Sequence, residues 1–104
     1  MTRSARYRSY RYCVAVATAK NRPLPVDGHT LDHIVPVSFG FKHDIPTQLI
    51  GSRENLQFVP YNDNIQKGQR ITTEAIALLR EWGYSDLADA VEYKLKQVQV
   101  NTED

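Results

Sequence analysis

Four polar side chains near the middle of the chain have types that suit metal-assisted hydrolysis. Asp32 and His33 are adjacent, Asn55 follows later, and Asn64 lies nine residues beyond Asn55. A histidine titrates near neutrality and can take a proton from water. Carboxylate and amide oxygens suit a hard divalent cation. An acid, an imidazole and two amides in one short stretch therefore match what hydrolysis of a phosphodiester requires.

Each side chain has a candidate role in such a site. His33 is the candidate general base, Asp32 the carboxylate ligand of a metal, and Asn64 a second ligand through its amide oxygen. Asn55 can hydrogen-bond around His33 and hold the imidazole ring. Lys67 lies one helical turn after Asn64, on the same side of a helix, where its ammonium can meet a phosphate oxygen.

Ordinary structural roles stay open for the same residues. A lone histidine is more often a hydrogen-bonded core residue than a base, and an aspartate or asparagine is often a turn or cap residue. Adjacent residues of a regular strand face opposite sides, so Asp32 and His33 share a site only where the strand bends or at its edge. His29 has the strand face of His33, and the pair His43-Asp44 offers a further place for a metal.

Two strands and a helix are predicted to position these residues. β-branched residues favour a strand over 29–35. Residues 38–52 contain two glycines and a proline, and we expect a loop there. A second strand is predicted over 56–59, and a helix over 62–67 with Asn62 as its N-cap.

The first 22 residues are strongly basic and are predicted to form a helix. They carry six basic side chains and no acidic one: Arg3, Arg6, Arg8, Arg11, Lys20 and Arg22. Four residues recur at helical spacing: Tyr7, Tyr10, Val14 and Ala17. The alternation of Tyr10, Tyr12, Val14 and Val16 would also suit a strand, but the alanines favour the helix. Arginines interleaved with tyrosines favour contact with a nucleic acid through phosphates and stacking. The alternative is a solvated arm.

The tail is predicted to form a pair of helices over residues 72–99. Thr72 or Thr73 caps the first helix, Gly83 closes it, and Ser85 caps the second. The second helix carries an apolar stripe of Leu87, Val91, Leu95 and Val98. This stripe either packs against the rest of the chain or forms a homodimer or partner-docking face.

The central stretch resembles the HNH endonuclease family. The family motif is Asp-His-Ile-x-Pro-x-Ser, then Asn-Leu, then Asn nine residues on, then Lys-Gly. The matching residues are Asp32, His33, Ile34, Pro36, Ser38, Asn55, Leu56, Asn64, Lys67 and Gly68. The run DHIVPVSF is also similar to the HNH domain of RNA-guided CRISPR effector nucleases, which have asparagine as the final motif residue. The resemblance covers about forty of the 104 residues.

This resemblance implies a ββα-metal module at 29–70 that hydrolyses DNA. It implies that Asp32 and Asn64 bind one Mg²⁺ or Mn²⁺, that His33 activates water, and that Asn55 fixes His33. The products would carry a 3′-hydroxyl and a 5′-phosphate. A single module cleaves one strand, so nicking is expected, and a double-strand cut would need a dimer.

The resemblance also bears on partners. Lys67, Arg70, Arg8 and Arg11 are the expected DNA contacts, mainly to phosphates because no recognition helix is evident. Many family members hold a structural zinc with two Cys-x-x-Cys pairs, which this chain lacks, so no structural zinc is expected. A compact module of this kind is typical of phage or mobile-element proteins. The alternative function is an inactive HNH-like module that binds DNA or a protein.

Length and composition set the remaining bounds. A chain of 104 residues, 41% hydrophobic and 24% charged, predicts one small globular domain over residues 1–104, and the predicted strands and helices make its class α+β. No apolar run reaches the roughly 18 residues of a membrane helix, and no signal peptide is recognisable. A cytoplasmic protein with no membrane partner is therefore expected. The single cysteine, Cys13, allows no internal disulfide, and we expect it to be a small buried residue.

Overall fold

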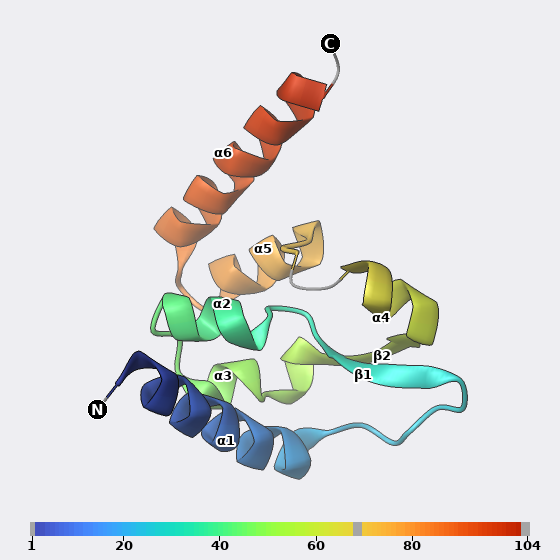
Figure 1. The fold of residues 1–104 in the computed structure, drawn as a ribbon. Helices are drawn as coiled ribbons and strands as arrows, with labels where there is room; N and C mark the ends of the chain where they lie inside the picture. The colour runs from blue at the N-terminus through green and yellow to red at the C-terminus, as the bar shows by residue number, and fades with distance from the viewer. Residues whose placement is uncertain (1, 68–69, 103–104) are drawn as a thin grey trace. The chain divides into compact units, whose positions relative to one another are not determined.

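The computed structural model describes residues 2–67 and 70–102, without the side chains of residues 65–67 and 98–102. It combines helices with a two-stranded antiparallel sheet, which confirms the α+β class (Figure 1). The chain divides into two compact units, Met1–Arg70 and Ile71–Asp104. This boundary falls between the predicted module and the predicted helical pair. One domain over the whole chain stays a prediction.

The basic N-terminal segment forms helix α1 (Arg3–Asn21), as predicted. The hydroxyl of Thr2 accepts a hydrogen bond from the backbone N–H of Ala5 at 3.1 Å and caps the helix. The predicted stripe is present: Val14 is buried, and the tyrosines and alanine at the same spacing are half-buried. The prediction for Cys13 is wrong, because this residue lies off the stripe and is exposed.

Strands β1 (His29–His33) and β2 (Leu56–Pro60) form an antiparallel hairpin in which Asp32 pairs with Gln57. β1 ends two residues earlier than predicted. The backbone N–H of Ile34 still donates to the carbonyl of Asn55, at 2.8 Å and in the register of the hairpin, but the chain bends at Ile34 and Val35 and the strand ends there.

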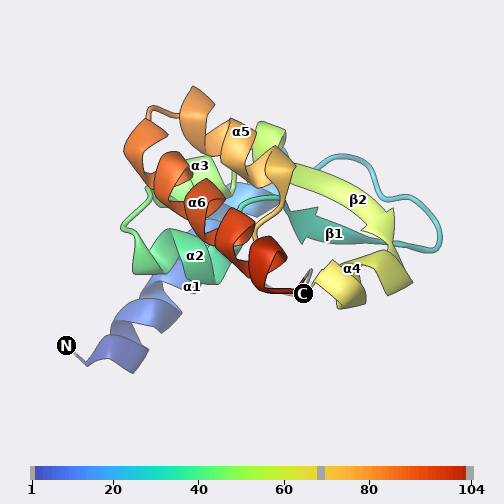
Figure 2. The ribbon, with the colours of Figure 1, turned by 90° about the horizontal axis from the view of Figure 1, so that it is seen from above.

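Helix α4 (Tyr61–Lys67) follows β2 directly and packs against both strands (Figure 2). It begins one residue earlier than predicted, so Asn62 lies inside the helix and does not precede it. The order of strand, connection, strand and helix is therefore the predicted one.

The prediction of a loop over 38–52 is wrong. The segment contains helices α2 (Val37–Lys42) and α3 (Thr47–Ile50), and a 3₁₀ turn follows at Arg53–Asn55. Pro36 and Pro46 stand at the N-caps of the two helices, where a proline suits the start of a helix. Helices this short are not stable by propensity, so tertiary packing must hold them.

That packing comes from α1. The ring of Phe41 lies 4.9 Å from the ring of Tyr7 and 5.6 Å from that of Tyr10, between centroids. The hydroxyl of Tyr10 donates to the carbonyl of Ile45 at 2.6 Å. Helix α3 approaches α1 at Gly51, where a Cβ atom would lie 2.6 Å from the Cβ of Ala17. The connection between the strands is thus built onto α1.

The second unit consists of α5 (Thr73–Glu81) and α6 (Ser85–Thr102), which pack together. Thr72 caps α5 by accepting from the N–H of Ala75 at 3.2 Å, and Gly83 follows α5 with a φ of 93°. The predicted helical pair is confirmed, but α6 begins at Ser85 itself, so the prediction of Ser85 as its N-cap is wrong. No helix in the described part of the chain is long and apolar enough to span a bilayer.

Cations of this unit are paired with acids. Arg80 donates to Asp89 at 2.6 Å and to Glu92 at 3.5 Å, and Lys96 also meets Glu92. The hydrogen bond to Asp89 raises the pKa of Arg80. On α6, the first three residues of the apolar stripe are half-buried, and the side chain of Val98 lies outside the described residues. Whether the stripe binds a partner stays a prediction.

Gly51→Ala tests the close approach of α3 to α1. The added methyl group meets Ala17 and the backbone of Thr18, so the helices must separate. We expect the free energy of unfolding to fall by about 1–3 kcal/mol. Urea unfolding measures this, with Gln48→Ala on the exposed side of α3 as the matched control. An unchanged urea midpoint for Gly51→Ala would show that the close approach carries no constraint.

Candidate functional site

Asp32 is a buried carboxylate held by a side chain of the neighbouring strand. It is 5% exposed, and Gln57 stands directly opposite on β2. Gln57 Nε2 donates to Asp32 Oδ2 at 2.9 Å. Burying a carboxylate is costly unless hydrogen bonds or a cation compensate it. Asp32 is therefore held more tightly than an ordinary turn or cap aspartate, which was the alternative structural role for this residue.

His33 is the last residue of β1 and is held from a different direction. Its Nε2 lies 3.0 Å from Oγ1 of Thr18, a buried residue of α1. Which of the two groups donates depends on the tautomer of the imidazole. The ring itself is half-buried, so part of it is accessible to solvent.

Asp32 and His33 thus keep the opposed orientation of a regular strand. Asp32 is held on the side of its cross-strand partner, and His33 is held by α1. The chain bends directly after His33, at Ile34 and Val35. His33 therefore stands at the end of β1, and a site shared by Asp32 and His33 stays a prediction.

Asn55 is a backbone clamp. It is fully buried, its Oδ1 accepts from the N–H of Val35 at 2.7 Å, and its Nδ2 donates to the carbonyls of Val35 at 3.1 Å and Ile50 at 2.8 Å. The predicted contact with the ring of His33 is not made among the described residues. Both amide hydrogens are already used, and Asn55 fixes the backbone two residues beyond His33 instead.

Asn64 lies on α4, the helix that packs against both strands, and its side chain is half-buried. The two candidate ligands therefore belong to elements in contact. Lys67 ends α4, but its side chain lies outside the described residues. Arg70 follows and is exposed.

The two other histidines lie elsewhere. His29 is exposed at the opposite end of β1, four residues or about 13 Å from His33 along the strand, and its Nδ1 lies 2.9 Å from the carbonyl oxygen of Asp27. His43 caps the end of α2, and its ring lies 4.4 Å from that of Phe39. The pair His43-Asp44 forms the turn that ends α2, where Asp44 is exposed and has a φ of 55°.

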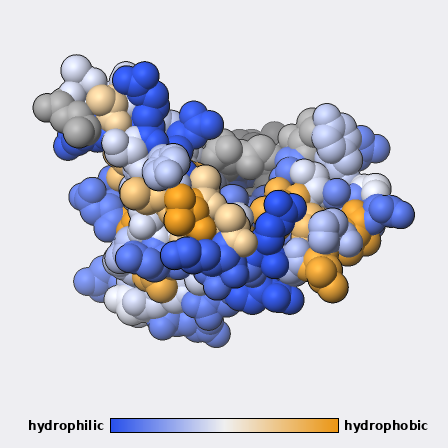
Figure 3. All heavy atoms as spheres, turned by 90° about the horizontal axis from the view of Figure 1, so that it is seen from below, coloured by the Kyte–Doolittle hydropathy of each residue, from blue (hydrophilic) through white to orange (hydrophobic). Residues whose placement is uncertain are grey.

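Arg8 and Arg11 are exposed on α1. With Tyr12 and Ala15 they line a shallow hollow of about 310 Å³. Figure 3 shows the face on which α1 lies: hydrophilic side chains cover most of it, and apolar ones form separate patches. The two arginines are thus accessible, as contact with a nucleic acid requires.

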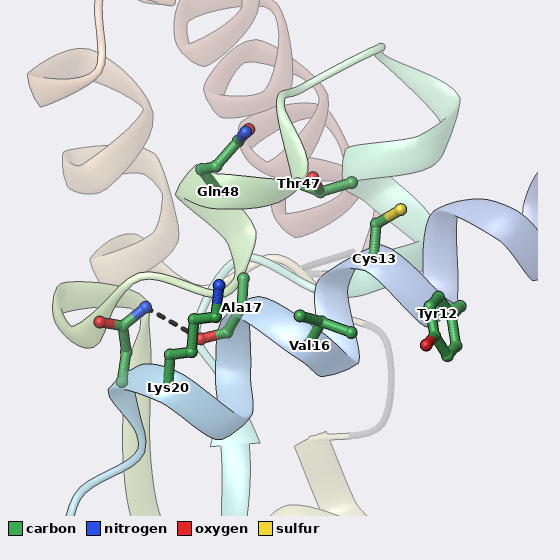
Figure 4. A pocket seen from close by; sticks show the side chains of 8 residues that line it. Tyr12, Cys13, Val16, Ala17, Lys20, Thr47 and Gln48 are labelled. Atoms are coloured by element: carbon green, nitrogen blue, oxygen red, sulfur yellow. Dashed lines mark hydrogen bonds between the residues drawn. The ribbon is translucent and has the colours of Figure 1, made fainter.

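A second hollow, of about 410 Å³, lies between α1 and α3 (Figure 4). Its lining residues are Tyr12, Cys13, Val16, Ala17, Lys20, Asn21, Thr47 and Gln48. Cys13 points toward α3, whereas Tyr12 projects from α1 away from it. Asn21 closes one end by donating to the carbonyls of Ala17 and Gly51.

Two residues of the site carry no sequence signal that singles them out. Thr18 lies 15 residues before His33 on another element, and nothing local relates the two. The position of Gln57 can be inferred once the hairpin register is known. A hairpin that pairs Leu56 with His33 necessarily puts Gln57 opposite Asp32. Both interactions depend on tertiary structure.

The two candidate ligands both offer oxygen donors. Asp32 and Asn64 supply a carboxylate and an amide, which suit Mg²⁺ or Mn²⁺. Among the described residues, no group of three or more histidine, cysteine, aspartate or glutamate side chains is arranged to hold a metal. A metal here would take its remaining ligands from water and phosphate.

Comparisons with family models, with curated proteins and with solved structures return no match for this chain.

Asn55→Ala is expected to destabilise the protein strongly. The substitution leaves the N–H and carbonyl of Val35 and the carbonyl of Ile50 buried without their partner. The expected loss in unfolding free energy is about 2–4 kcal/mol. Urea unfolding measures it, and the control is His33→Ala, which removes a half-buried side chain from the same region. A loss below about 0.5 kcal/mol for Asn55→Ala would mean that water replaces the amide.

Thr18→Val is expected to remove the hydrogen bond between α1 and the ring of His33. Valine keeps the shape of threonine and removes only the hydroxyl that pairs with Nε2. In the unaltered protein we expect one imidazole tautomer to dominate, and in Thr18→Val the ratio of the two tautomers should change because Nε2 loses this partner. Thr18→Ser keeps the hydroxyl and should keep the ratio. The ¹⁵N shifts of the ring nitrogens measure this, and equal shifts in all three proteins would rule out the hydrogen bond in solution.

Proposed function

We propose that this protein is a metal-dependent DNA endonuclease of the HNH type, with His33 as general base. The observation that supports it best is the joint placement of three motif residues. Asp32 and His33 end β1, and Asn55 clamps the connection that begins directly after them. Helix α4, which carries Asn64, packs on the same hairpin. The residues that the resemblance singles out thus lie in one small ββα arrangement.

The role of His33 follows from its position. It lies at the strand edge, half-buried, with its Nε2 tied to Thr18. An imidazole that is restrained but partly accessible can take a proton from an attacking water in a fixed direction. General bases of this kind contribute typically about 10²–10⁴-fold to a rate.

The residues around Asp32 fit a divalent cation. The carboxylate is buried, and Gln57 restrains one of its oxygens, as a partner of a ligand often does. Asp32 and Asn64 would hold the ion between β1 and α4. When bound, Mg²⁺ or Mn²⁺ would neutralise charge that develops on the phosphate. Lys67 and Arg70 would add positive charge beside it.

DNA as the substrate is supported by the charge of α1. Its exposed basic side chains make no ion pair among the described residues, whereas Arg80 and Lys96 of the other unit are paired with acids. Cations left without acidic partners are available to phosphates, and such contacts release counterions. Arg8 and Arg11 are the proposed phosphate-binding residues on this helix.

Nicking of supercoiled plasmid tests the proposal. With Mg²⁺ or Mn²⁺ at low salt we expect relaxed circles from the unaltered protein and none with EDTA. His33→Ala should lower the rate by at least about 100-fold. The matched control is His29→Ala, which removes an exposed histidine from the other end of the same strand and should keep the rate.

The outcomes separate the two functions. A metal-independent product would contradict the proposed metal dependence, and equal loss in His29→Ala and His33→Ala would contradict His33 as the base. No product with either metal, together with retained DNA binding, would favour the non-cutting DNA-binding module. In that case Asp32→Asn and Asn64→Ala should leave binding unchanged.

A further inference from the structure

The tyrosines of α1 are not equivalent. Tyr7 and Tyr10 pack against Phe41, and the hydroxyl of Tyr10 is bonded to the carbonyl of Ile45. These two rings hold α2 on α1 and are half-buried. Tyr12 is 71% exposed, and its ring projects away from α3 (Figure 4). Tyr12 is therefore the tyrosine of this helix that can accept a planar partner.

The surroundings of Tyr12 are cationic. It borders the hollow of about 310 Å³ with Arg8, Arg11 and Ala15. The guanidinium carbon of Arg11 lies 5.7 Å from the centroid of the Tyr7 ring, a cation–π contact that restrains the side chain. Neither arginine forms an ion pair among the described residues. A small residue, Ala15, leaves the hollow open between the charges and the ring.

Arg11 links this surface to the flank of α1 that faces His33, whereas Tyr12 lies about a third of a turn round the helix from that flank. Arg11 precedes Thr18 by seven residues, close to two turns of helix, so their side chains share one flank about 10 Å apart along the axis. Thr18 is the residue that contacts His33. The flank toward α3 is different, because it carries Ala17 and Cys13. A strand bound at Tyr12 would therefore pass Arg11 before it reaches the flank of Thr18 and the imidazole.

We propose that Arg8, Arg11 and Tyr12 form a binding site for one nucleotide of an unpaired DNA strand. The guanidiniums take the phosphate, and the base stacks on the Tyr12 ring. A base in a duplex is stacked on its neighbours and cannot lie on a side chain, whereas an unpaired base can. Stacking is tolerant of sequence, which agrees with a surface that offers no base-edge donors or acceptors beyond the arginines and the tyrosine hydroxyl. The inference rests on the proposed function for its scissile strand, and it implies DNA with a single-stranded segment as substrate.

Fluorescence anisotropy tests this without cleavage. The unaltered protein is titrated, in EDTA and at roughly 50 mM salt, against a dye-labelled mixed-sequence oligonucleotide and against the same strand annealed to its complement. We expect tighter binding to the single strand. Tyr12→Ala should weaken single-strand binding by about tenfold and duplex binding by less than about twofold. Tyr12→Trp should retain it, because the indole also stacks.

Two further variants give the test its controls. Tyr93→Ala removes a tyrosine of similar exposure from α6 and should change neither affinity. Arg8→Gln with Arg11→Gln should weaken binding of both substrates. The double variant should also make the fall of log affinity with log salt less steep, by about one for each phosphate that is no longer neutralised. Circular dichroism of each variant excludes unfolding as the cause of weaker binding.

The result bears on the site separately from cleavage. Equal weakening of single-strand and duplex binding in Tyr12→Ala, or no weakening at all, would overturn the stacking site and leave the nicking experiment untouched. A selective loss of single-strand binding in a protein that fails to nick would establish the site on a non-cutting module.

Discussion

The side chain of Asn55 carries the constraint on which the rest of the first unit depends. It bonds the peptide groups of Val35 and Ile50 at full burial, and so joins the end of β1, the end of α3 and the start of β2. An interior amide bonded in this way is well compensated, whereas an amide missing even one partner would cost a desolvation penalty. This clamp keeps the connection between the strands in one conformation. The position of His33, two residues before Val35, follows from it.

Helix α1 supplies the second support. It carries the rings that hold α2, lies against Gly51 at the end of α3, and reaches the imidazole through Thr18. One helix thereby binds the inter-strand connection and the candidate base. The same helix exposes arginines that no acid among the described residues neutralises. Helix α1 therefore carries exposed cations and also restrains, through Thr18, the imidazole of His33 on β1.

The two neighbouring motif residues, Asp32 and His33, are held by different elements. Gln57 holds Asp32 from the paired strand, and Thr18 holds His33 from α1. Opposed faces of a strand would separate a ligand from a base in the middle of a sheet. His33 is the last residue of β1, and the chain bends directly after it. The separation of ligand and base is therefore less restrictive at this position. Two different supports at one strand end can therefore serve a shared centre beside α4.

The sequence by itself determined the α+β class, the order of hairpin and helix, the basic N-terminal helix and the capped helical pair, because local periodicity, prolines and caps act over a few residues. It also singled out Asp32, His33, Asn55 and Asn64 as candidates. Only the tertiary structure decided that residues 38–52 are largely helical, since α2 and α3 are too short to be stable without α1. The burial of Asn55 on Val35 and Ile50, the hydrogen bond of Thr18 with His33 and the exposure of Tyr12 were likewise decided there, because each depends on which distant segments pack together.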